Sequence, residues 1–310
     1  MSVALEKSAS GRPAPAPHPD AASGRPARWL VVLALLAVWV VWGSTYLAIK
    51  IALGSLPPFG MAATRFFLAG SILYVVLRLR GTPPPNPAQW RSAVVIGLLM
   101  LTLANGGVVW AQGRISSSVA ALGVASTPLW VALLAGFLER WPRPIEWAGL
   151  TIGFLGVFLL NWDGDLRATP AAAVALLVSQ ISWAVGAMLN RRLTLPEGAM
   201  ASASQMIAGG AILFLASVLA GEGVPRAPSA ESLAALAYLV AFGSIVAFSA
   251  FNFLIRNVSP SLATSNAYVN PIVAVLLGVG LAGEQLRAAS LVAMAIIVTG
   301  VALVLLAQDR

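Results

Sequence analysis

The sequence predicts an all-α integral membrane protein in which ten transmembrane helices form two inverted five-helix repeats. Three observations lead to this fold class: the composition, the spacing of the apolar runs, and a resemblance between the two halves of the chain. Of the 310 residues, 59% are hydrophobic and 10% are charged, and the mean hydropathy is +0.86. Soluble domains carry about 25% charged residues, so most of this chain is suited to lipid.

Ten apolar runs are long enough to cross a bilayer as helices, which takes roughly 20 residues. Within these runs Asp and Glu are absent, and the cations are Lys50 and Arg65. Proline and glycine cluster between the runs, as is typical of the loops of a helical bundle. The predicted spans are Trp29–Leu53, Phe59–Leu77, Ser92–Trp110, Ser117–Leu138, Trp147–Trp162, Pro170–Leu189, Ala199–Leu219, Leu233–Phe253, Leu262–Ala282 and Ala288–Ala307.

The domain organisation follows from these spans. Residues 1–28 are rich in Pro, Ala, Ser and Gly and have too few large apolar residues for a core, so we expect a disordered cytoplasmic tail. The apolar run after the tail exceeds the h-region of a signal peptide, about 7–15 residues, which predicts a retained first span. Residues 29–162 are expected to form the first repeat and residues 170–307 the second.

The basic residues predict the orientation. If ten spans alternate across the membrane, 13 of the 19 Lys and Arg residues fall on the side of the N-terminus and five on the other, with Arg65 inside a span. Basic residues near span ends are enriched on the cytoplasmic side, so both termini should be cytoplasmic. Tryptophans at the span ends are expected to anchor the protein at the headgroups.

An internal repeat links this architecture to transport. At offsets of about 140 residues, Arg65 falls on Gln205 and Pro128 on Pro271, in a common order along the chain. Each repeat has five spans, an odd number, so the second repeat enters the membrane in the opposite orientation. Inverted repeats in transporters place the substrate near the bilayer midplane, where the two halves meet, and can open to either side.

Several segments together carry a family resemblance. They are Trp42-Gly43-Ser44-Thr45-Tyr46, Ile49-Lys50, Pro57-Pro58, Arg65-Phe66, Pro128, Glu139, Thr264 to Pro271 and Gly283-Glu284. With these segments the chain, from about Trp29 to its C-terminus, resembles the EamA family of the drug/metabolite transporter superfamily. The resemblance implies ten helices in two inverted halves and the export of amino acids or other small amphipathic metabolites across the bacterial inner membrane.

We predict a substrate cavity between the repeats, lined by aromatic and polar side chains. Trp42 and Tyr46 share a face of the first span, and Trp183 lies on the equivalent span of the second repeat. Polar side chains inside a span normally face the bundle interior or a wet cavity. The candidate substrate-binding residues are Trp42, Tyr46, Arg65, Asn105, Trp110, Trp183, Asn252 and Asn270.

Each of these residues has a structural alternative. The rings can pack helix against helix or touch lipid, and the amides can bond between helices, a contact worth about 0.6–2 kcal/mol in membranes. Arg65 can extend to the outer headgroups or pair structurally, or it can form a positive mouth that attracts a substrate carboxylate.

Four further residues are candidates for gating. Pro128 and Pro271 are predicted to interrupt the fourth and ninth spans, each freeing a carbonyl one turn earlier. Gly43 and Gly186 permit close helix approach or bending. These residues act as hinges in one interpretation and only shape the bundle in the other.

Several chemistries are excluded. The chain has no Cys and a single His, in the tail, so haem and zinc chemistry and thiol nucleophiles are not expected. Gly-x-x-x-x-Gly-Lys and Gly-x-Ser-x-Gly do not occur. We therefore expect no enzyme and no cofactor, with a small-molecule substrate and the lipid bilayer as partners and no nucleic acid. A monomer is compatible with these features.

The energetics and the competing functions remain open at this point. The spans contain no Asp, Glu or His, which favours facilitated movement or exchange of a neutral or zwitterionic amino acid over carboxylate-based proton coupling. Glu139 and Glu284, at helix ends, are the acidic residues nearest to the bundle. The alternatives are a drug or other metabolite exporter of the same fold, a channel, and a membrane-embedded enzyme or sensor scaffold.

Overall fold

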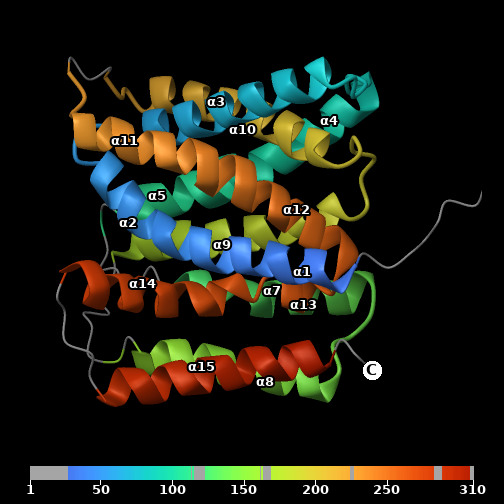
Figure 1. Cartoon of the computed structure of the whole chain (residues 1–310), viewed down its shortest axis with the longest axis vertical. Helices are drawn as coiled ribbons and strands as arrows, with labels where there is room; N and C mark the ends of the chain where they lie inside the picture. The colour runs from blue at the N-terminus through green and yellow to red at the C-terminus, as the bar shows by residue number, and fades with distance from the viewer. Residues whose placement is uncertain are drawn as a thin grey trace, which may run out of the picture.

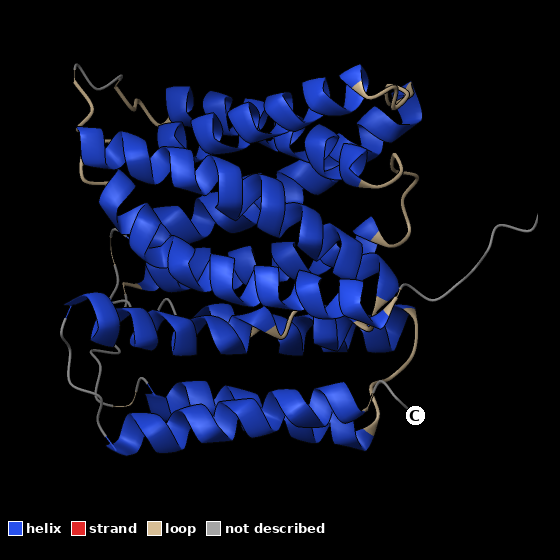
Figure 2. Cartoon of the chain, viewed as in Figure 1, coloured by secondary structure: helices blue, strands red, loops and turns tan. Residues whose placement is uncertain are grey.

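The computed structural model describes residues 27–112, 114, 123–160, 162, 169–223, 227–282 and 288–307. Within these ranges every regular element is a helix, and the helices lie side by side in one bundle (Figure 2). The proposed tail, apart from its last two residues, lies outside the described residues, as does Glu284.

The first half of the chain contributes five spans. The first and third are each built from three consecutive helical segments, because a π-helical stretch divides the α-helix. The elements are α1 (Arg28–Leu36), η1 (Ala37–Val41) and α2 (Trp42–Ala52); α3 (Pro58–Leu79); α4 (Pro87–Ile96), η2 (Gly97–Gly106) and α5 (Gly107–Gln112); α7 (Thr127–Leu138); and α8 (Pro144–Leu160).

The second half contributes five more. Its third span again contains a π-helical stretch, at the place equivalent to η2. The elements are α9 (Pro170–Asn190); α10 (Ala199–Leu219); α11 (Ala230–Tyr238), η3 (Leu239–Val246) and α12 (Ala247–Asn257); α13 (Pro260–Ala263) and α14 (Asn266–Ala282); and α15 (Ala288–Leu306).

These elements confirm the predicted all-helical membrane fold. Seven of the described spans are long and apolar enough to cross a membrane by length and composition, and the fourth, fifth and ninth are shorter. Many large apolar side chains are exposed, such as Leu79 and Leu219, which suits a surface that faces lipid. Three helices begin at least three residues before their predicted spans: α4 at Pro87 instead of Ser92, α11 at Ala230 instead of Leu233, and α8. α8 begins at Pro144 instead of Trp147, so the carboxylate of Glu146 lies in its first turn and is buried.

Proline and capping residues explain where several helices begin. Proline stands in the first turn of α3, α4 and α9, where its missing N–H costs no helical hydrogen bond. Asn86 caps α4 in a reciprocal box with Gln89. The first turn of α3 is capped by a residue from the other half of the chain. The Glu222 carboxylate accepts hydrogen bonds from the backbone N–H groups of Phe59 at 3.0 Å and Gly60 at 2.8 Å.

The two halves are arranged with opposite orientations. α1 begins and α15 ends at the same edge of the bundle, which we call the terminus side (Figure 1). The first span runs away from this edge and its equivalent, α9, runs back toward it (Figure 1). Equivalent spans also pack against each other most extensively, α3 against α10 and α8 against α15, as a pseudo-two-fold axis in the membrane plane requires.

Glycine allows these equivalent helices to approach each other closely. A Cβ atom on Gly300 of α15 would lie 2.5 Å from the backbone nitrogen of Gly153 on α8, and one on Gly70 of α3 would lie 2.7 Å from that of Ile207 on α10. Backbones in direct contact are the arrangement that small residues permit in membrane bundles. The two glycine-packed pairs lie at opposite ends of the long axis of the bundle (Figure 1).

Candidate functional site

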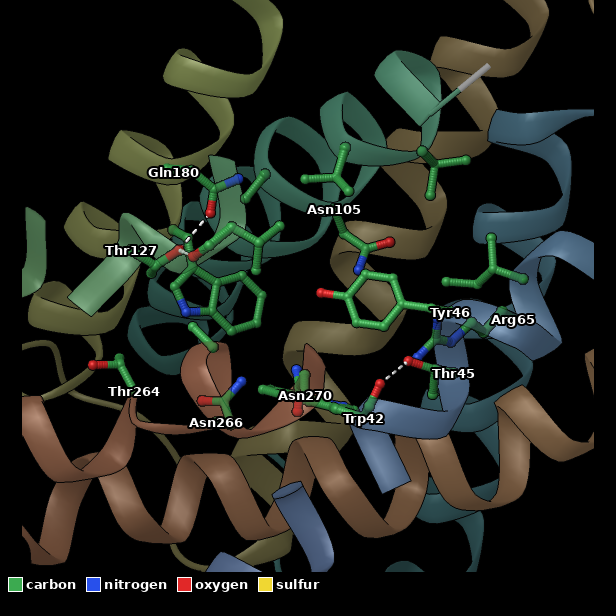
Figure 3. Close-up of a pocket in the computed structure, with 17 residues that line it drawn as sticks. Trp42, Thr45, Tyr46, Arg65, Asn105, Thr127, Gln180, Thr264, Asn266 and Asn270 are labelled. Atoms are coloured by element: carbon green, nitrogen blue, oxygen red, sulfur yellow. Dashed lines mark hydrogen bonds between the residues drawn. The ribbon is translucent and has the colours of Figure 1, made fainter. Parts of the chain in front are cut away.

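A cavity lies between the two repeats and takes its walls from both (Figure 3). It contains about 760 Å³ of empty space, part of which is continuous with the surroundings. The lining residues come from both halves of the chain and are Trp42, Thr45, Tyr46, Ile49, Arg65, Ala104, Asn105, Val108, Val109, Val124, Thr127, Gln180, Trp183, Thr264, Asn266, Ala267 and Asn270.

The cavity occupies the half of the bundle away from the terminus side. Its residues on the first span fall in the second half of a helix that begins at Arg28, and Arg65 falls in the first half of α3, which runs the opposite way. Asn105 lies near the far end of the third span. Because neighbouring spans alternate in direction, these positions lie at the same level of the bundle.

Three aromatic rings meet next to the cavity. The indole of Trp42 meets that of Trp183 edge to face, with centroids 5.6 Å apart, and the ring of Phe251 lies 5.3 Å from the first and 5.2 Å from the second. The Trp42 indole N–H donates to the carbonyl of Gly243 at 3.0 Å, so its polar edge is satisfied by the other repeat. Two of the three rings line the cavity, and we call this group the aromatic cluster.

Arg65 is the charged residue among the cavity-lining side chains, and it is 3% exposed. Its Nε donates to the Ser244 hydroxyl at 2.8 Å, and its Cζ lies 4.8 Å from the centroid of the Phe66 ring. Gly243 leaves the space that the guanidinium occupies, since a Cβ there would lie 2.9 Å from a terminal nitrogen. A cation at a helix centre costs at least about 2.5–3.5 kcal/mol, so these contacts hold a group that strongly favours a counter-charge.

Two amides with unused acceptors also face this space. Asn105 on η2 and Asn270 on α14 both line the cavity, and each has a buried side-chain oxygen with no hydrogen-bond partner among the described residues. Figure 3 shows Asn105 beside the ring of Tyr46, with Asn270 across the cavity near Trp42. Buried polar atoms are normally paired, so these oxygens identify places where a bound molecule or water would donate.

Five polar residues of the lining are not among the candidate substrate-binding residues predicted from the sequence: Thr45, Thr127, Gln180, Thr264 and Asn266. The Thr127 hydroxyl donates to the Gln180 side-chain oxygen across the boundary between the repeats (Figure 3). Gln180 is an amide inside an apolar span, the same signal that identified Asn105. Its neighbour Ser179 is not among the lining residues and donates to the carbonyls of Ala175 and Leu103.

Six of the eight candidate substrate-binding residues line the cavity, and two do not. Asn252 is buried in a network on α12, where it accepts from Asn190 at 2.7 Å and donates to Ser202 at 2.8 Å and Gln205 at 2.9 Å. Trp110 lies near the end of α5, with the guanidinium carbon of Arg114 4.0 Å from its ring centroid. Asn252 and its three partners are called the amide network below.

The four gating candidates have different surroundings. A Cβ on Gly43 would lie 2.5 Å from that of Val273, and one on Gly186 would lie 2.5 Å from Cγ of Met100, so both glycines pack tightly across the repeat boundary. Pro128 stands in the first turn of α7, directly after a helix break. Pro271 lies inside α14.

The predicted position of the interruption in the ninth span is therefore corrected. This span breaks at Thr264 and Ser265, between α13 and α14. The hydroxyls of both residues donate to carbonyls of α13, at 2.9 Å to Pro260 and 2.8 Å to Leu262, which ends the short helix.

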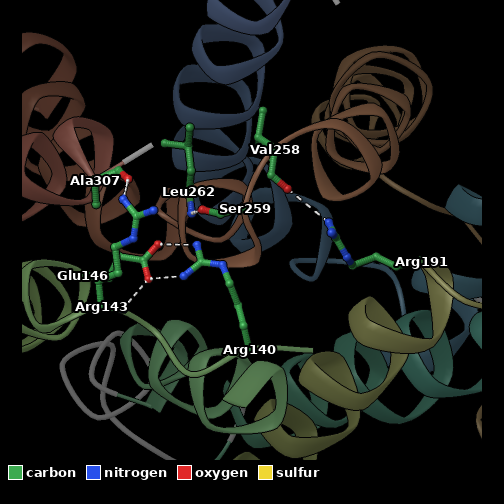
Figure 4. Close-up of polar contacts among 8 residues, drawn as sticks. All are labelled: Arg140, Arg143, Glu146, Arg191, Val258, Ser259, Leu262 and Ala307. Carbon is green, nitrogen blue, oxygen red and sulfur yellow. Dashed lines mark hydrogen bonds and ion pairs between the residues drawn. The ribbon is translucent and has the colours of Figure 1, made fainter. Parts of the chain in front are cut away.

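Ionic contacts join helix ends on the terminus side. Arg191, at the end of α9, pairs with Glu139 at the end of α7 at 2.8 Å. It also donates to the carbonyl of Val258, beyond the end of α12, at 3.0 Å (Figure 4). Arg140 pairs with the buried Glu146 of α8 at 3.0 Å. The Arg191 contacts tie a helix of the first repeat to two of the second, and we call them the terminus-side latch.

Comparison with known proteins gives the same architecture and adds a family. The model of the EamA-like transporter family matches residues 29–162 and again residues 170–306. The inner membrane transporter YedA of Escherichia coli K12 is 45% identical over 276 residues, which cover 89% of this chain and 90% of that protein. Protein PecM of Dickeya dadantii is 30% identical over 256 residues, covering 79% and 84% respectively.

A solved structure supports the fold independently. One crystal structure superimposes with a TM-score of 0.77 and covers 92% of this chain and 99% of its own, at 22% sequence identity. At that identity the likeness concerns the fold alone.

Proposed function

The chain belongs to the EamA-like transporter family and is a multi-pass inner membrane transporter, and we propose that it exports amino acids or similar small amphipathic metabolites. The observation that carries this proposal is the cavity shared by the two repeats, in which aromatic rings and hydrogen-bonding groups surround one space. Such a mixture of apolar surface and a few convergent polar groups is typical of sites for small molecules.

In this proposal the solute crosses by alternating access, with the termini in the cytoplasm. The cavity lies away from the terminus side, while the aromatic cluster, the amide network and the terminus-side latch join the helices toward that side. To admit a solute from the cytoplasm, the contacts between Trp42 and Trp183 and between Glu139 and Arg191 must separate. The described arrangement is then the one in which the cytoplasmic side is closed.

The two glycine-packed helix pairs are the proposed fixed parts of this motion. Their backbones touch at Gly300 with Gly153 and at Gly70 with Ile207, so sliding or opening there would break many close contacts at once. The helices around the cavity lie between these two pairs (Figure 1). Movement of these central helices against the fixed pairs would switch access from one side to the other.

The lining also bears on how transport is driven. The described residues around the cavity include no Asp, Glu or His, the groups that most readily bind and release a proton at mid-membrane. We therefore propose facilitated movement or exchange of the solute, without a carboxylate relay in the cavity.

Counterflow in liposomes tests the proposal. The purified protein is reconstituted, the liposomes are loaded with an unlabelled amino acid, and entry of the same labelled compound is followed without a pH gradient. We expect entry well above that of protein-free liposomes and above that of liposomes loaded with buffer. If a panel of labelled amino acids and amphipathic metabolites enters no faster than into protein-free liposomes, with or without a pH gradient, the proposed function is wrong.

A further inference from the structure

We infer that the cavity selects solutes with a free carboxylate, which Arg65 binds, and that the amide oxygens of Asn105 and Asn270 bind a second, hydrogen-donating group of the same solute. The inference rests on the proposed function and narrows its substrate class to small carboxylates that also carry an ammonium or hydroxyl group. According to this inference, purely cationic compounds are not substrates, whereas a drug exporter of the same fold would accept them.

The first argument is the uncompensated charge of Arg65. Among the described residues its one hydrogen-bond partner is Ser244, a neutral hydroxyl, and the two ion pairs of the described chain involve other arginines. Its two terminal nitrogens therefore have no partner in the described residues. A buried charge is stable only when it is paired, so the missing partner is a negative group supplied by the solute.

The geometry of the guanidinium suits a carboxylate in particular. With Nε held by Ser244, the planar group is fixed in orientation, and its remaining donors form a fork that matches two carboxylate oxygens. The absence of a side chain at Gly243 lets one terminal nitrogen lie against this glycine, where a Cβ would be 2.9 Å away. Arg65 also lines the cavity, so the fork is accessible from the solute's side.

The second argument is the lack of acidic groups around the cavity. The described lining residues contain one arginine and no Asp or Glu. A solute whose charge is only positive would meet the like charge of Arg65 in a medium that screens poorly. A solute with a carboxylate would instead cancel that charge, so the cavity favours acids over amines of the same shape.

The third argument is the pair of unused amide oxygens. Asn105 and Asn270 come from opposite repeats, both line the cavity, and both have a buried side-chain oxygen without a partner in the described residues. An ammonium or hydroxyl group on the solute would donate to these oxygens and would thereby be bound by both repeats. The rings of Trp42, Tyr46 and Trp183 leave apolar surface for the rest of the molecule.

Four probes that differ by one group each test the selectivity in proteoliposomes. Phenylalanine has both groups, phenylpropanoate has only the carboxylate, and phenylalaninamide and phenylethylamine have only the positive group. We expect labelled phenylalanine to enter fastest, phenylpropanoate more slowly, and the two amines at least about tenfold more slowly than phenylalanine, because they leave Arg65 unpaired.

Variants assign the selectivity to residues. Arg65→Gln should lose the preference for acids over amines, whereas Arg65→Lys should keep it with a lower rate. Asn105→Ala and Asn270→Ala should lower phenylalanine transport toward that of phenylpropanoate. Arg80→Gln, at the exposed end of the same helix, is the matched control and should behave as the unmodified protein. Size-exclusion profiles and thermal unfolding show which variants are folded.

The possible results separate the inference from the proposed function. If the amines enter as fast as the acids, or if a folded Arg65→Gln variant retains the preference, the inference is overturned while transport itself stands. If Arg65→Gln does not fold, the four probes on the unmodified protein and on Arg65→Lys still decide, because equal rates for acids and amines contradict the inference. If no probe and no solute of the wider panel enters, the proposed function fails.

Discussion

The indole rings of Trp42 and Trp183 meet edge to face across the boundary between the two repeats, with their centroids 5.6 Å apart. They stand on equivalent spans, so the duplication brings two copies of one feature into contact. Both rings also line the cavity. A change at either residue therefore alters the solute's surroundings and the contact between the repeats together.

Removal of a cavity-lining side chain should impair transport. We expect Trp183→Ala and Asn270→Ala each to lower the initial counterflow rate at least about tenfold, equivalent to about 1.4 kcal/mol, because each removes a cavity wall contact. Trp162→Ala, which removes an exposed indole at the end of the fifth span, is the control and should leave the rate unchanged. Normal transport by both cavity variants would mean that the solute passes elsewhere.

The amide network predicts a stability effect at Asn252. Asn252→Ala removes three hydrogen bonds and leaves Asn190, Ser202 and Gln205 without one partner each, so the free energy of unfolding should fall by about 1–2 kcal/mol. Thermal unfolding in detergent measures the change. Asn257→Ala on the same helix is the control, because Asn257 is exposed and bonds only to its own helix. Equal melting temperatures would contradict the network's contribution.

The terminus-side latch predicts that transport survives neutralisation of Glu139. The pair with Arg191 is partly exposed, with about a quarter of each side chain accessible, and such pairs contribute about 1 kcal/mol or less. Glu139→Gln should therefore retain counterflow without a pH gradient. Glu284→Gln, outside the described residues, should retain it as well, because Glu284 is predicted to lie at a helix end and not in the cavity. A strict dependence on a proton gradient that either variant abolishes would move the energetic coupling to the helix ends.

The glycine contact between α8 and α15 predicts a cost at Gly300. The Cβ atom of Gly300→Ala would lie 2.5 Å from a backbone nitrogen of Gly153, so the helices must separate, at an expected cost of about 1–3 kcal/mol in stability. Gly280→Ala provides the control, because nothing lies within 4 Å of a Cβ placed there. A lower melting temperature for the first variant alone is the expected result.

Cysteine labelling tests the orientation in the membrane. The chain has no native cysteine, so a single one at Gly164 can be labelled without background. With the termini in the cytoplasm, a membrane-impermeant reagent should reach it in intact cells, whereas Glu197→Cys, in an exposed loop on the terminus side, should react only after permeabilisation. The reverse pattern would place the termini outside.

The sequence alone predicted the features that hydropathy and duplication determine. The ends of the helices lie within a few residues of the predicted spans in most cases, because a lipid-facing helix must be apolar over a length that the bilayer sets. The equivalent spans of Trp42 and Trp183 led to the prediction that both rings line a cavity, whereas the contact between the two rings is known only from the structure. Helical periodicity also grouped the residues of one face correctly on the first span.

Periodicity did not indicate what each face touches. Asn252 and Asn270 look alike in sequence, yet one bonds to neighbouring helices and the other lines the cavity. On α9 a rotation of one residue, from Ser179 to Gln180, decides which polar group faces the cavity. Each π-helical stretch also changes which side of the helix the following residues face. The positions of these stretches depend on packing between helices, which hydropathy does not reveal.

The packing of α3 on α10 and of α8 on α15 has an evolutionary consequence. A contact between equivalent elements is self-complementary, as in a symmetric homodimer, so a single five-helix unit already contains both surfaces of each pair. An ancestor of half this length would thus have been able to associate with an oppositely oriented copy of itself. Fusion of the copies freed each position to change independently, as Arg65 in the cavity and its counterpart Gln205 in the amide network illustrate.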